Sequence, residues 1–558
     1  MIAFRIKKLT TNVFLLLSSF AVQAQNTVGL ISIDHEKTIG GFNLIYPEHQ
    51  PDVYLLNECG EIVHVWEDDT DLRPGKTACL LENGNLLRAK ISPALGASFG
   101  TGGAGGVVEM LTWDNELVWS YTVADSLNRQ HHDVLYMENE NVLMIVWEWK
   151  NYDELIENGF DTLHNAADVL WPDYLLEVNP QTNEIAWEWH AWDHLVQDFD
   201  PTKKNYGVVS DHPELIDVNY KELTFERQDF MHTNAIDYDP IKDQVLLSVR
   251  HFNEIWIIDH STTSEEASGH TGGNSGRGGD LLFRWGNPAA YGKGNEADQK
   301  LFNQHDAQWI DDFVDSNYGH FGEIVLFNNK VSTNTSAGQI LAPVWEEAAK
   351  SYAMENGVFL PNTFSETISH PDAAKNYSSN ASSIQILGDG AVVMCAANQG
   401  FLFELAKDGS VAWEYRIPLR FGLPVTQGFA LSVNDNFTFQ CEKYLADFPA
   451  FNGKELTPMG FIELEPNIAF CALSGTSEKK EGELIIYPNP MVDYFFIENN
   501  MTLPARVEIF NNYGERVYHE LINTGKNKID AVDWPSGIYF LAEKEQGIFY
   551  KLIKMEQG

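Results

Sequence analysis

Short apolar runs recur along the chain, and each is followed by a Gly, Asn or Asp turn and a second run that ends in tryptophan. The clear copies begin at residues 53–56, 107–110, 174–177, 255–258 and 401–404 and end at Trp66, Trp119, Trp187, Trp285 and Trp413, respectively. A weak sixth copy ends at Trp345. Such runs between turn residues are typical of β-hairpins, and helical periodicity of useful length is rare. The pattern therefore predicts antiparallel β-sheet built from repeated units.

Repeated sheets need protected edges, and a radial arrangement around an axis provides that protection. We therefore predict an all-β chain in which residues 25–473 form a six-bladed β-propeller. A β-solenoid or two stacked sandwiches would also contain such hairpins. The wide and irregular spacing, with long inserts, disfavours the solenoid.

A second pattern precedes the hairpins. Each candidate innermost strand carries a polar residue four positions before its first large apolar residue, and these residues are Lys76, His131, His232, His305, Asn380 and Gln427. Segments 232–239 and 305–312 align without a gap. Because the first strand of each propeller blade lines the central channel, we expect these six residues to form a ring with three histidines at one mouth.

Such a ring of histidines has three uses. Imidazole titrates at about pH 6.5, so it can serve as a nucleophile or an acid in the transfer of an anionic group. Neutral imidazole is also the commonest protein ligand for zinc or copper. A purely structural hydrogen bond across the channel is the third use. The pattern alone leaves these alternatives open.

The N-terminal segment has the features of an export signal. Arg5, Lys7 and Lys8 precede an apolar run at 13–22, and Ala24 is a small residue suited to cleavage. We interpret residues 1–24 as a secretory signal peptide, because the run is far shorter than the ~20 residues that span a bilayer. We expect no integral membrane segment in the mature chain.

The composition changes near residue 474. Residues 474–482 are small and charged, which indicates a linker. Residues 483–558 alternate β-branched and aromatic residues between turns, which predicts a small C-terminal β-sandwich. The segments YPNP at 487–490, PSGIYFL at 535–541 and KLIK at 551–554 resemble the C-terminal sorting domain of the type IX secretion system. An adhesive or carbohydrate-binding Ig-like domain is the alternative.

This resemblance implies that the type IX secretion machinery is a partner. The protein is then expected to pass through the periplasm of a Gram-negative bacterium and to be secreted or held at the cell surface.

Composition excludes several other classes of protein. The chain has 80 acidic and 37 basic residues, a formal net charge of −43, so we expect no nucleic acid partner. Five scattered cysteines form no CxxC pair, which argues against a disulfide framework or structural zinc, and their odd number leaves at least one thiol outside any intramolecular pair. Acidic runs such as 68–71 lack the spacing of an EF-hand loop.

Four segments, in order, resemble the motif series of bacterial arylsulfate sulfotransferases: 229–239, 247–259, 283–286 and 304–307. The similarity runs from about residue 40 to residue 470. It implies a six-bladed propeller that moves a sulfuryl group from a phenolic sulfate ester to another phenol. The family route passes through a sulfated histidine, which two further histidines and an arginine support, and it uses no nucleotide sulfate donor. We therefore expect phenolic sulfate esters and phenols as small-molecule partners, and no cofactor.

The resemblance also assigns individual residues. His232 and His305 fall on supporting histidines of the family, and Arg250 lies in the family's S-x-R segment. The family arginine is expected just after a segment that here ends at Lys330, which offers a point charge without the bidentate fork of arginine. The nucleophilic histidine belongs to a later blade, where this chain has Asn380, and an amide cannot accept a sulfuryl group.

His370, ten residues before Asn380, is a further candidate if it reaches inward. The expected catalytic residues are thus His232, His305, Arg250 and His370, and the expected substrate-binding residues are His131, Asn380, Lys330 and Lys76. We favour an exported aryl-sulfate sulfotransferase. A secreted or surface propeller that binds anions without catalysis, and a metal-dependent hydrolase, are the alternatives.

Deletion of residues 483–558 tests the proposed sorting role. Because the sorting signal is independent of the propeller, we expect the truncated protein to fold and to remain in the periplasm. Cell fractionation followed by immunoblotting measures this. Truncated protein in the medium would contradict the prediction.

Overall fold

The computed structural model describes most of the chain between residues 26 and 554. The described residues are 26–70, 72–93, 99, 102–163, 165, 167–220, 228–388, 390–471, 484–487, 491, 493–499, 503–511, 516–543 and 548–554. The expected signal peptide at 1–24 and the expected linker at 474–482 lie outside them.

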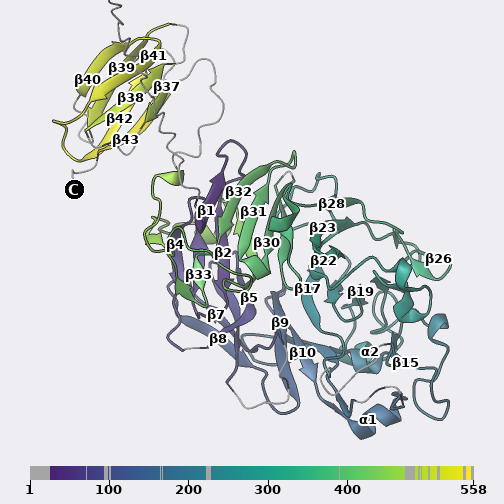
Figure 1. Ribbon diagram of the computed structural model, residues 1–558. Coiled ribbons are helices and arrows are strands. Elements are labelled where there is room, and N and C mark those ends of the chain that lie inside the picture. Colours follow the sequence, from purple (N-terminus) through teal and green to yellow (C-terminus); the bar gives the residue numbers. More distant parts are fainter. Residues whose placement is uncertain are drawn as a thin grey trace, which may run out of the picture.

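The described part of 26–471 contains six antiparallel sheets of four or five strands (Figure 1). The first, listed from the inside outward, is β35 (Thr438–Tyr444), β2 (Phe42–Pro47), β3 (Val53–Leu56), β4 (Glu61–Trp66) and β36 (Gly460–Phe461). The second is β5 (Pro74–Leu80), β6 (Leu86–Ile91), β7 (Gly106–Leu111) and β8 (Leu117–Thr122). The third is β9 (Asn128–Tyr136), β10 (Val142–Glu148), β13 (Asp173–Val178) and β14 (Ile185–His190).

The other three sheets follow in chain order. The fourth is β17 (Thr233–Asp239), β18 (Gln244–Val249), β19 (Glu254–Asp259) and β20 (Phe283–Trp285). The fifth is β21 (His305–Trp309), β22 (Ile324–Ser332), β23 (Thr335–Leu341) and β28 (Glu366–Ile368). The sixth is β29 (Ser383–Leu387), β30 (Ala391–Ala396), β31 (Phe401–Leu405), β32 (Val411–Arg416) and β1 (Gly29–Ile33).

Short elements fill the connections between these sheets. The two-stranded pairs are β11 (Lys150–Asn151) with β12 (Val169–Leu170), β15 (Leu195–Val196) with β16 (Ile216–Asp217), β24 (Trp345–Glu346) with β25 (Ser351–Tyr352), β26 (Met354–Glu355) with β27 (Val358–Phe359), and β33 (Leu419–Arg420) with β34 (Leu423–Pro424). The α-helices are α1 (Tyr152–Glu157), α2 (Ser264–Ala267) and α3 (Ala373–Asn376). No helix in the described residues has the length and apolar character needed to cross a membrane.

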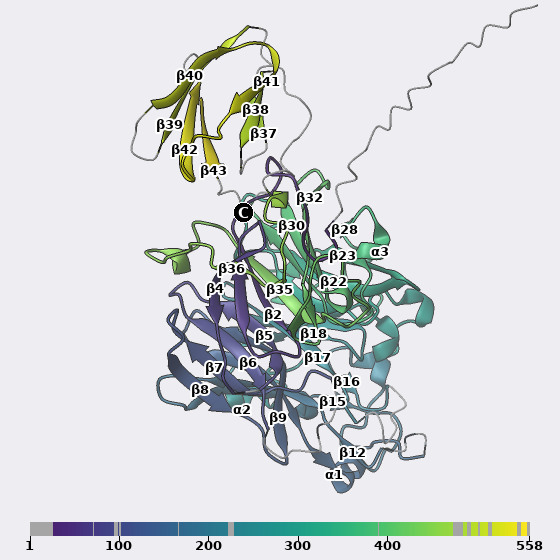
Figure 2. The same cartoon turned by 60° about the vertical axis from the view of Figure 1, so that its left-hand side comes forward.

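The two ends of the main domain are interleaved. The late strand β35 pairs with β2, and the early strand β1 pairs with β32, so the first and last sheets each contain strands from both ends (Figure 2). A disulfide between Cys59 and Cys471 adds a covalent link across 412 residues. Cys79, Cys395 and Cys441 are free thiols. The two ends of the main domain are thus joined by strand pairing and by one disulfide bond.

The tryptophans of the sequence repeat connect neighbouring sheets at their outer strands. Each indole Nε1 donates a hydrogen bond to a loop of the next sheet: Trp66 to Thr112 O (3.1 Å), Trp119 to Asn183 Oδ1 (2.8 Å), Trp187 to Thr262 Oγ1 (3.1 Å), Trp285 to Pro361 O (2.6 Å) and Trp413 to Glu58 O (2.8 Å). The expected sixth copy at Trp345 is wrong, because β24 belongs to an insert and β28 is the outer strand of that sheet. Five outer strands therefore carry the repeat.

The innermost strands are linked by hydrogen bonds between side chains and the next backbone. Asp133 accepts from Ile236 N (3.0 Å), Asp237 from Trp309 N (2.5 Å) and Asp306 from Ile384 N (2.7 Å). Gln385 then bonds Lys443 N, Tyr444 Oη accepts from Leu80 N (2.7 Å), and Thr77 bonds Asp133. These bonds run from each innermost strand to the next and return to the first.

The all-β prediction is confirmed, and the sheets have a propeller-like arrangement. The count of six blades stays a prediction, with which the order of the sheets agrees. Gln427 is not on an innermost strand, because its side chain bonds Thr27 N and Val28 O, and β35 occupies that position.

The C-terminal part has its own two sheets, shown in yellow in Figure 1. One contains β37 (Leu484–Tyr487), β38 (Tyr494–Asn499) and β41 (Gly525–Asp530), and the other contains β40 (Arg516–Ile522), β39 (Ala505–Asn511), β42 (Gly537–Glu543) and β43 (Ile548–Lys554). Buried apolar side chains from both sheets, such as Phe495 and Ile509, form one core cluster. This arrangement confirms the predicted β-sandwich.

The inner ring gives a pH-dependent contribution to stability. Burial raises the pKa of Glu442 to about 8, and Tyr444 donates a hydrogen bond to its side chain. An unfolded Glu titrates near pH ~4.3, so the folded state alone keeps this proton between about pH 4 and about pH 8, and stability falls as the pH rises through that range.

Glu442→Gln is neutral at every pH and should lack this loss. When the pH is raised from about 6 to about 9, the free energy of unfolding of wild type should fall by on the order of 2 kcal/mol more than that of the variant. Urea unfolding at both pH values measures the difference, with the exposed-site variant Glu346→Gln as control. An identical pH dependence for Glu442→Gln and wild type would contradict a buried protonated Glu442.

Candidate functional site

The site begins with a shared irregularity of the innermost strands. β5, β9, β17 and β21 each leave regular pairing near their starts, at a β-bulge or similar shift of register. Lys76 (φ 100°), His132 (φ 50°) and Asp306 (φ 55°) have left-handed backbone conformations at these points, and His232 (φ 55°) has one immediately before β17. Bulges redirect side chains and are frequent beside active sites. Here they bring histidines of separate sheets together.

Three histidines and an aromatic ring form the centre of this cluster. The rings of His132 and His232 meet edge to face, with centroids 4.5 Å apart. Phe439 on β35 contacts both His132 (5.8 Å) and His305 (6.1 Å). All three histidines are largely buried, and His232 is the most exposed at 9%. Imidazoles from β9, from the residue before β17 and from β21 therefore share one apolar-walled region.

His132 is held tightly by its surroundings. Its Nδ1 lies 2.8 Å from Nδ1 of His131, and the His131 ring stacks on Trp147 at 3.9 Å. A Cβ atom on Gly103 would lie 1.9 Å from the His132 ring, so only glycine fits there. His131 Nε2 in turn lies 3.3 Å from Oδ1 of Asp173. His131 thus lies behind His132 and orients it.

His232 is paired with a buried carboxylate. Its Nδ1 hydrogen-bonds Oδ2 of Asp229, and the other carboxylate oxygen accepts from Nε1 of Trp147 (3.1 Å). Burial raises the pKa of Asp229, while burial and the charge of Arg250 hold the pKa of His232 well below 6.5. The bond to Asp229 leaves Nε2 as the nitrogen available for chemistry.

His305 has a different set of partners. Its Nδ1 lies 2.9 Å from Asn303 O and 2.8 Å from Asn329 Oδ1, both of which can only accept. Nε2 accepts a hydrogen bond from Ala381 N (3.1 Å). Burial, followed by the charge of Arg250, places the pKa of His305 well below 6.5. His305 is therefore a neutral imidazole with its proton on Nδ1.

Two cations lie close enough to act on the histidines. The charge of Arg250 contributes to the lowered pKa of His232 and His305, and that of Lys76 to the lowered pKa of His132 and His232. Lys76 forms an ion pair with Glu48 and lies over the Phe437 ring at 6.0 Å. The region thus combines neutral imidazoles with positive charge, which suits an anionic substrate.

The remaining predicted residues lie outside the cluster contacts. Asn380 is exposed and precedes Ala381, whose amide bonds His305. Lys330 is exposed and follows Asn329, which also bonds His305. His370 is buried against the sixth sheet, where Nε2 bonds Glu414 Oε1 (2.9 Å) and Nδ1 accepts from Asp372 N (2.9 Å). Both ring nitrogens of His370 are therefore engaged away from His232 and His305.

The cluster also contains donors suited to a metal ion. Ligand atoms of Asp229, His232 and His251 lie within 4.8 Å of one another. However, Nδ1 of His251 donates to Asp229 O (2.9 Å), and Nδ1 of His232 bonds the Asp229 carboxylate. Burial lowers the pKa of His251 to about 3. The Nδ1 atoms of both histidines are thus engaged in hydrogen bonds to Asp229, so the geometry favours acid–base chemistry over metal binding.

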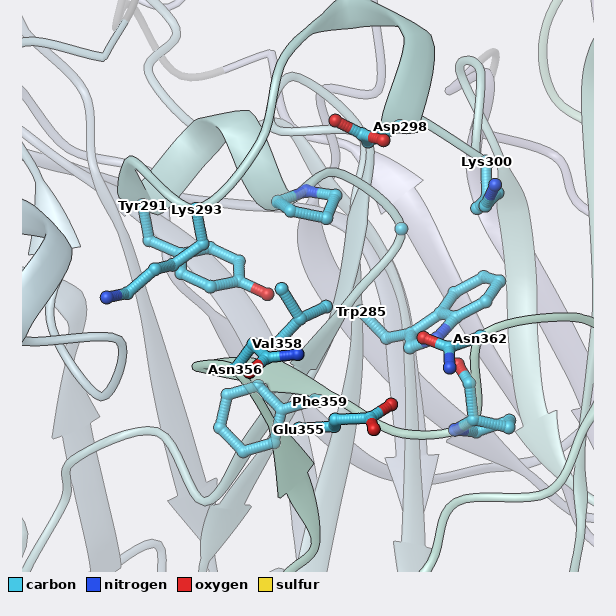
Figure 3. Close-up of a pocket in the computed structure, with 13 residues that line it drawn as sticks. Trp285, Tyr291, Lys293, Asp298, Lys300, Glu355, Asn356, Val358, Phe359 and Asn362 are labelled. Atoms are coloured by element: carbon cyan, nitrogen blue, oxygen red, sulfur yellow. The ribbon is translucent and has the colours of Figure 1, made fainter.

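A separate pocket of about 310 Å³ lies between the fourth and fifth sheets (Figure 3). Trp285, Tyr291 and Phe359 line it, and Lys293 and Lys300 lie on opposite sides. Its lining contains no histidine and none of the residues of the histidine cluster. Its size therefore does not make it the centre of the predicted chemistry.

Sequence reasoning missed several residues of the cluster. His132, rather than its neighbour His131, contacts His232. Asp229, three residues before His232, and Asn329, within the segment that ends at Lys330, supply the decisive hydrogen bonds. The Asp-x-x-His spacing was a usable signal for Asp229. The bulge that selects His132 has no such signal in the sequence.

Several solved structures show distant similarity to this chain. A Bacteroides caccae protein of unknown function is 12% identical, over 67% of this chain and 93% of that one, with a TM-score of 0.36. Virginiamycin B lyase from Staphylococcus aureus is 9% identical over 71% and 90%, with a TM-score of 0.30. AztD from Citrobacter koseri is 8% identical over 88% and 99%, with a TM-score of 0.28. These similarities carry no functional argument.

Family models give a clearer result. No curated protein matches the chain significantly. A model described as Secretion system C-terminal sorting domain matches residues 485–554 and indicates export by the type IX system to the cell surface or the medium. A model described as Arylsulfotransferase (ASST) matches residues 115–416, more than half of the chain, and includes His132, His232, Arg250 and His305. The chain therefore belongs to the arylsulfotransferase family.

Proposed function

We propose that this exported protein transfers a sulfuryl group between phenolic compounds by way of a histidine, without a nucleotide sulfate donor. The observation that carries the proposal is the convergence of His132, His232 and His305 beside the charge of Arg250. Phe439 adds an apolar wall against which an aryl group can pack. Family membership supports the same reaction class.

His305 is the proposed nucleophile. A nucleophilic imidazole has to be neutral and to keep its attacking lone pair in place. Asn303 O and Asn329 Oδ1 hold the proton on Nδ1, which leaves the lone pair on Nε2. Neither acceptor is charged, so neither favours the imidazolium form. The substrate sulfur has to displace the Ala381 amide, which then lies beside the oxygens of the transferred group.

His232 and Asp229 are the proposed acid–base pair. Burial raises the pKa of Asp229, and its carboxyl group shares a hydrogen bond with Nδ1 of His232, so this pair can hold and release a proton where His305 cannot. In the first half-reaction, His305 Nε2 attacks sulfur, the bond from sulfur to the phenolic oxygen breaks, and the protonated pair gives its proton to that oxygen. In the second, the oxygen of the acceptor phenol attacks sulfur, the bond from sulfur to Nε2 of His305 breaks, and the phenol returns a proton to the pair. Arg250 offsets the charge on the sulfate oxygens.

Two features favour a second function. The hydrogen bond from Ala381 N already occupies Nε2 of His305, and Asn380 stands where the sequence comparison expected a nucleophile. A secreted propeller that binds anions without catalysis would tolerate both features. The two functions differ in whether a covalent intermediate forms.

Labelling with a sulfate ester tests the nucleophile. The purified full-length protein is mixed with 4-nitrophenyl sulfate carrying labelled sulfur, quenched at alkaline pH and mapped by peptide. We expect the label on His305, its complete loss in His305→Ala, and a nitrophenol release that added phenol accelerates. His232→Ala should keep a label on His305 while turnover falls ~10²–10⁴-fold.

His370→Ala is the matched control, because this buried histidine bonds Glu414 away from the cluster, and it should retain the label. A label on His232 or His370 would refute His305 as nucleophile. Absence of both label and nitrophenol burst in the folded protein would replace the enzyme by the binding function.

Asp229→Asn tests the acid–base pair. An amide cannot stabilise imidazolium as a carboxylate does, so proton delivery to the leaving phenol should weaken. We expect a larger fall in kcat/KM for phenyl sulfate than for 4-nitrophenyl sulfate, because nitrophenolate leaves readily without a proton. Steady-state rates for both esters, with exposed-site Asp153→Asn as control, measure the difference. Equal losses for the two esters would contradict the proton-delivery role.

A further inference from the structure

A second histidine–carboxylate cluster lies outside the proposed catalytic site. It contains His194, which follows β14, together with His270 and Asp280 from the loop between α2 and β20. Oδ1 of Asp280 lies 2.8 Å from Nδ1 of His194 and 2.7 Å from Nδ1 of His270. The ligand atoms of the three residues lie within 4.8 Å of one another. Two imidazole nitrogens thus converge on one carboxylate oxygen.

The hydrogen bond of the other ring nitrogen of His194 shows which nitrogen of this ring carries the proton. Nε2 lies 2.8 Å from Ala267 O, and a carbonyl oxygen can only accept, so Nε2 carries a proton. In a neutral ring, Nδ1 then presents its lone pair to the Asp280 carboxylate. Two lone pairs at 2.8 Å repel each other unless a cation lies between them. The site therefore requires either a proton between His194 and Asp280 or a metal ion.

We propose that His194, His270 and Asp280 bind a divalent transition metal, with Zn²⁺ as the best-suited ion. Two imidazole nitrogens and one carboxylate oxygen form a set that zinc accepts readily, and a fourth position is left for water. The metal would bind to the two Nδ1 atoms and to the carboxylate of Asp280. Separations of 2.7 and 2.8 Å between ligand atoms have to widen on binding, and the His270 side chain, 59% exposed, is free of the packing that would prevent this.

The surroundings of His194 resemble the outer shell of a metal site. A ligating histidine usually donates its other N–H to a carbonyl or carboxylate, as His194 does to Ala267 O. The His194 ring stacks in parallel with Trp189, whose indole donates to Gly279 O (2.7 Å). A Cβ on Gly279 would lie 2.0 Å from Ala267 O and 2.6 Å from Nε2 of His194. Glycine at 279 thus permits the approach that orients His194.

The proposed role of the metal is to fasten the 268–280 loop to the third sheet. Gly279 N bonds Gly269 O (3.0 Å) and Gly278 N bonds Gly272 O (3.1 Å), so the loop is folded on itself. His270 and Asp280 lie at its two ends, and His194 lies outside it. A metal held by all three residues would join both ends of the loop to a fixed histidine.

Metal binding is tested with His270→Gln. His270 is exposed, so this variant should fold, whereas changes at the buried His194 would also disturb packing. After dialysis against a chelator, Zn²⁺ is titrated by calorimetry and Co²⁺ by its visible absorption. We expect wild type to bind Zn²⁺ at this site, to show absorption bands of tetrahedral Co²⁺, and to gain thermal stability with Zn²⁺. His270→Gln should bind at least ~10-fold more weakly and lose these bands.

His212→Gln is the matched control, because His212 is also exposed and pairs with one carboxylate, Glu214, at 3.0 Å. It should behave as wild type. Binding of Zn²⁺ that His270→Gln leaves unchanged would belong to other residues, such as Asp229 with His251, and would overturn the proposal. Absence of Zn²⁺ binding to wild type would show that a proton, and not a metal ion, lies between His194 and Asp280, and would also overturn the proposal.

Discussion

The main domain depends on one kind of interaction, the hydrogen bond from a side chain on an innermost strand to the backbone of the next. Innermost strands of a radial array diverge too much to pair by their backbones all along their length. Asp133, Asp237 and Asp306 bridge three of these gaps, and Gln385 bridges a fourth. The bridges occupy buried space, and burial raises the pKa of Asp306 to about 7 and that of Asp133 to about 6. The centre of the fold is thus held by buried carboxyl groups whose pKa values are raised by burial.

The same strands carry the irregularities that form the candidate site. His132 and His232 adopt left-handed conformations, which cost on the order of 1–3 kcal/mol for most residues but are less unusual for histidine. Hydrogen bonds of the next residue in each case, from Ile236 N to Asp133 and from Thr233 N to Asp173, fix the strand that follows. The hydrogen bonds between innermost strands therefore offset the cost of the strained backbone conformations that turn the histidines toward the site.

The sequence could predict what depends on local pattern. Alternating apolar runs and terminal tryptophans identified five of the outer strands, and histidines at matched positions identified β17 and β21. It could not predict the choice of His132 over His131, because a bulge changes which of two neighbours faces the site. Trp345 and Gln427 resembled repeat positions, but long-range pairing of β28 and β35 excluded them. His370 was a candidate only if its side chain reached inward, and the carboxylate of Glu414 holds it elsewhere.

Residue type alone does not assign chemistry within the cluster, because His232 and His305 are the same residue on equivalent strands. Their hydrogen-bond partners distinguish them. The carboxyl group of Asp229, whose pKa is raised by burial, can hold a proton beside Nδ1 of His232, whereas the amide and the carbonyl beside Nδ1 of His305 cannot. Asp229 comes from the loop before β17, and Asn329 comes from β22, the neighbour of β21. The two histidines can therefore serve as an acid–base group and a nucleophile, because the residues that hydrogen-bond their Nδ1 atoms differ in charge.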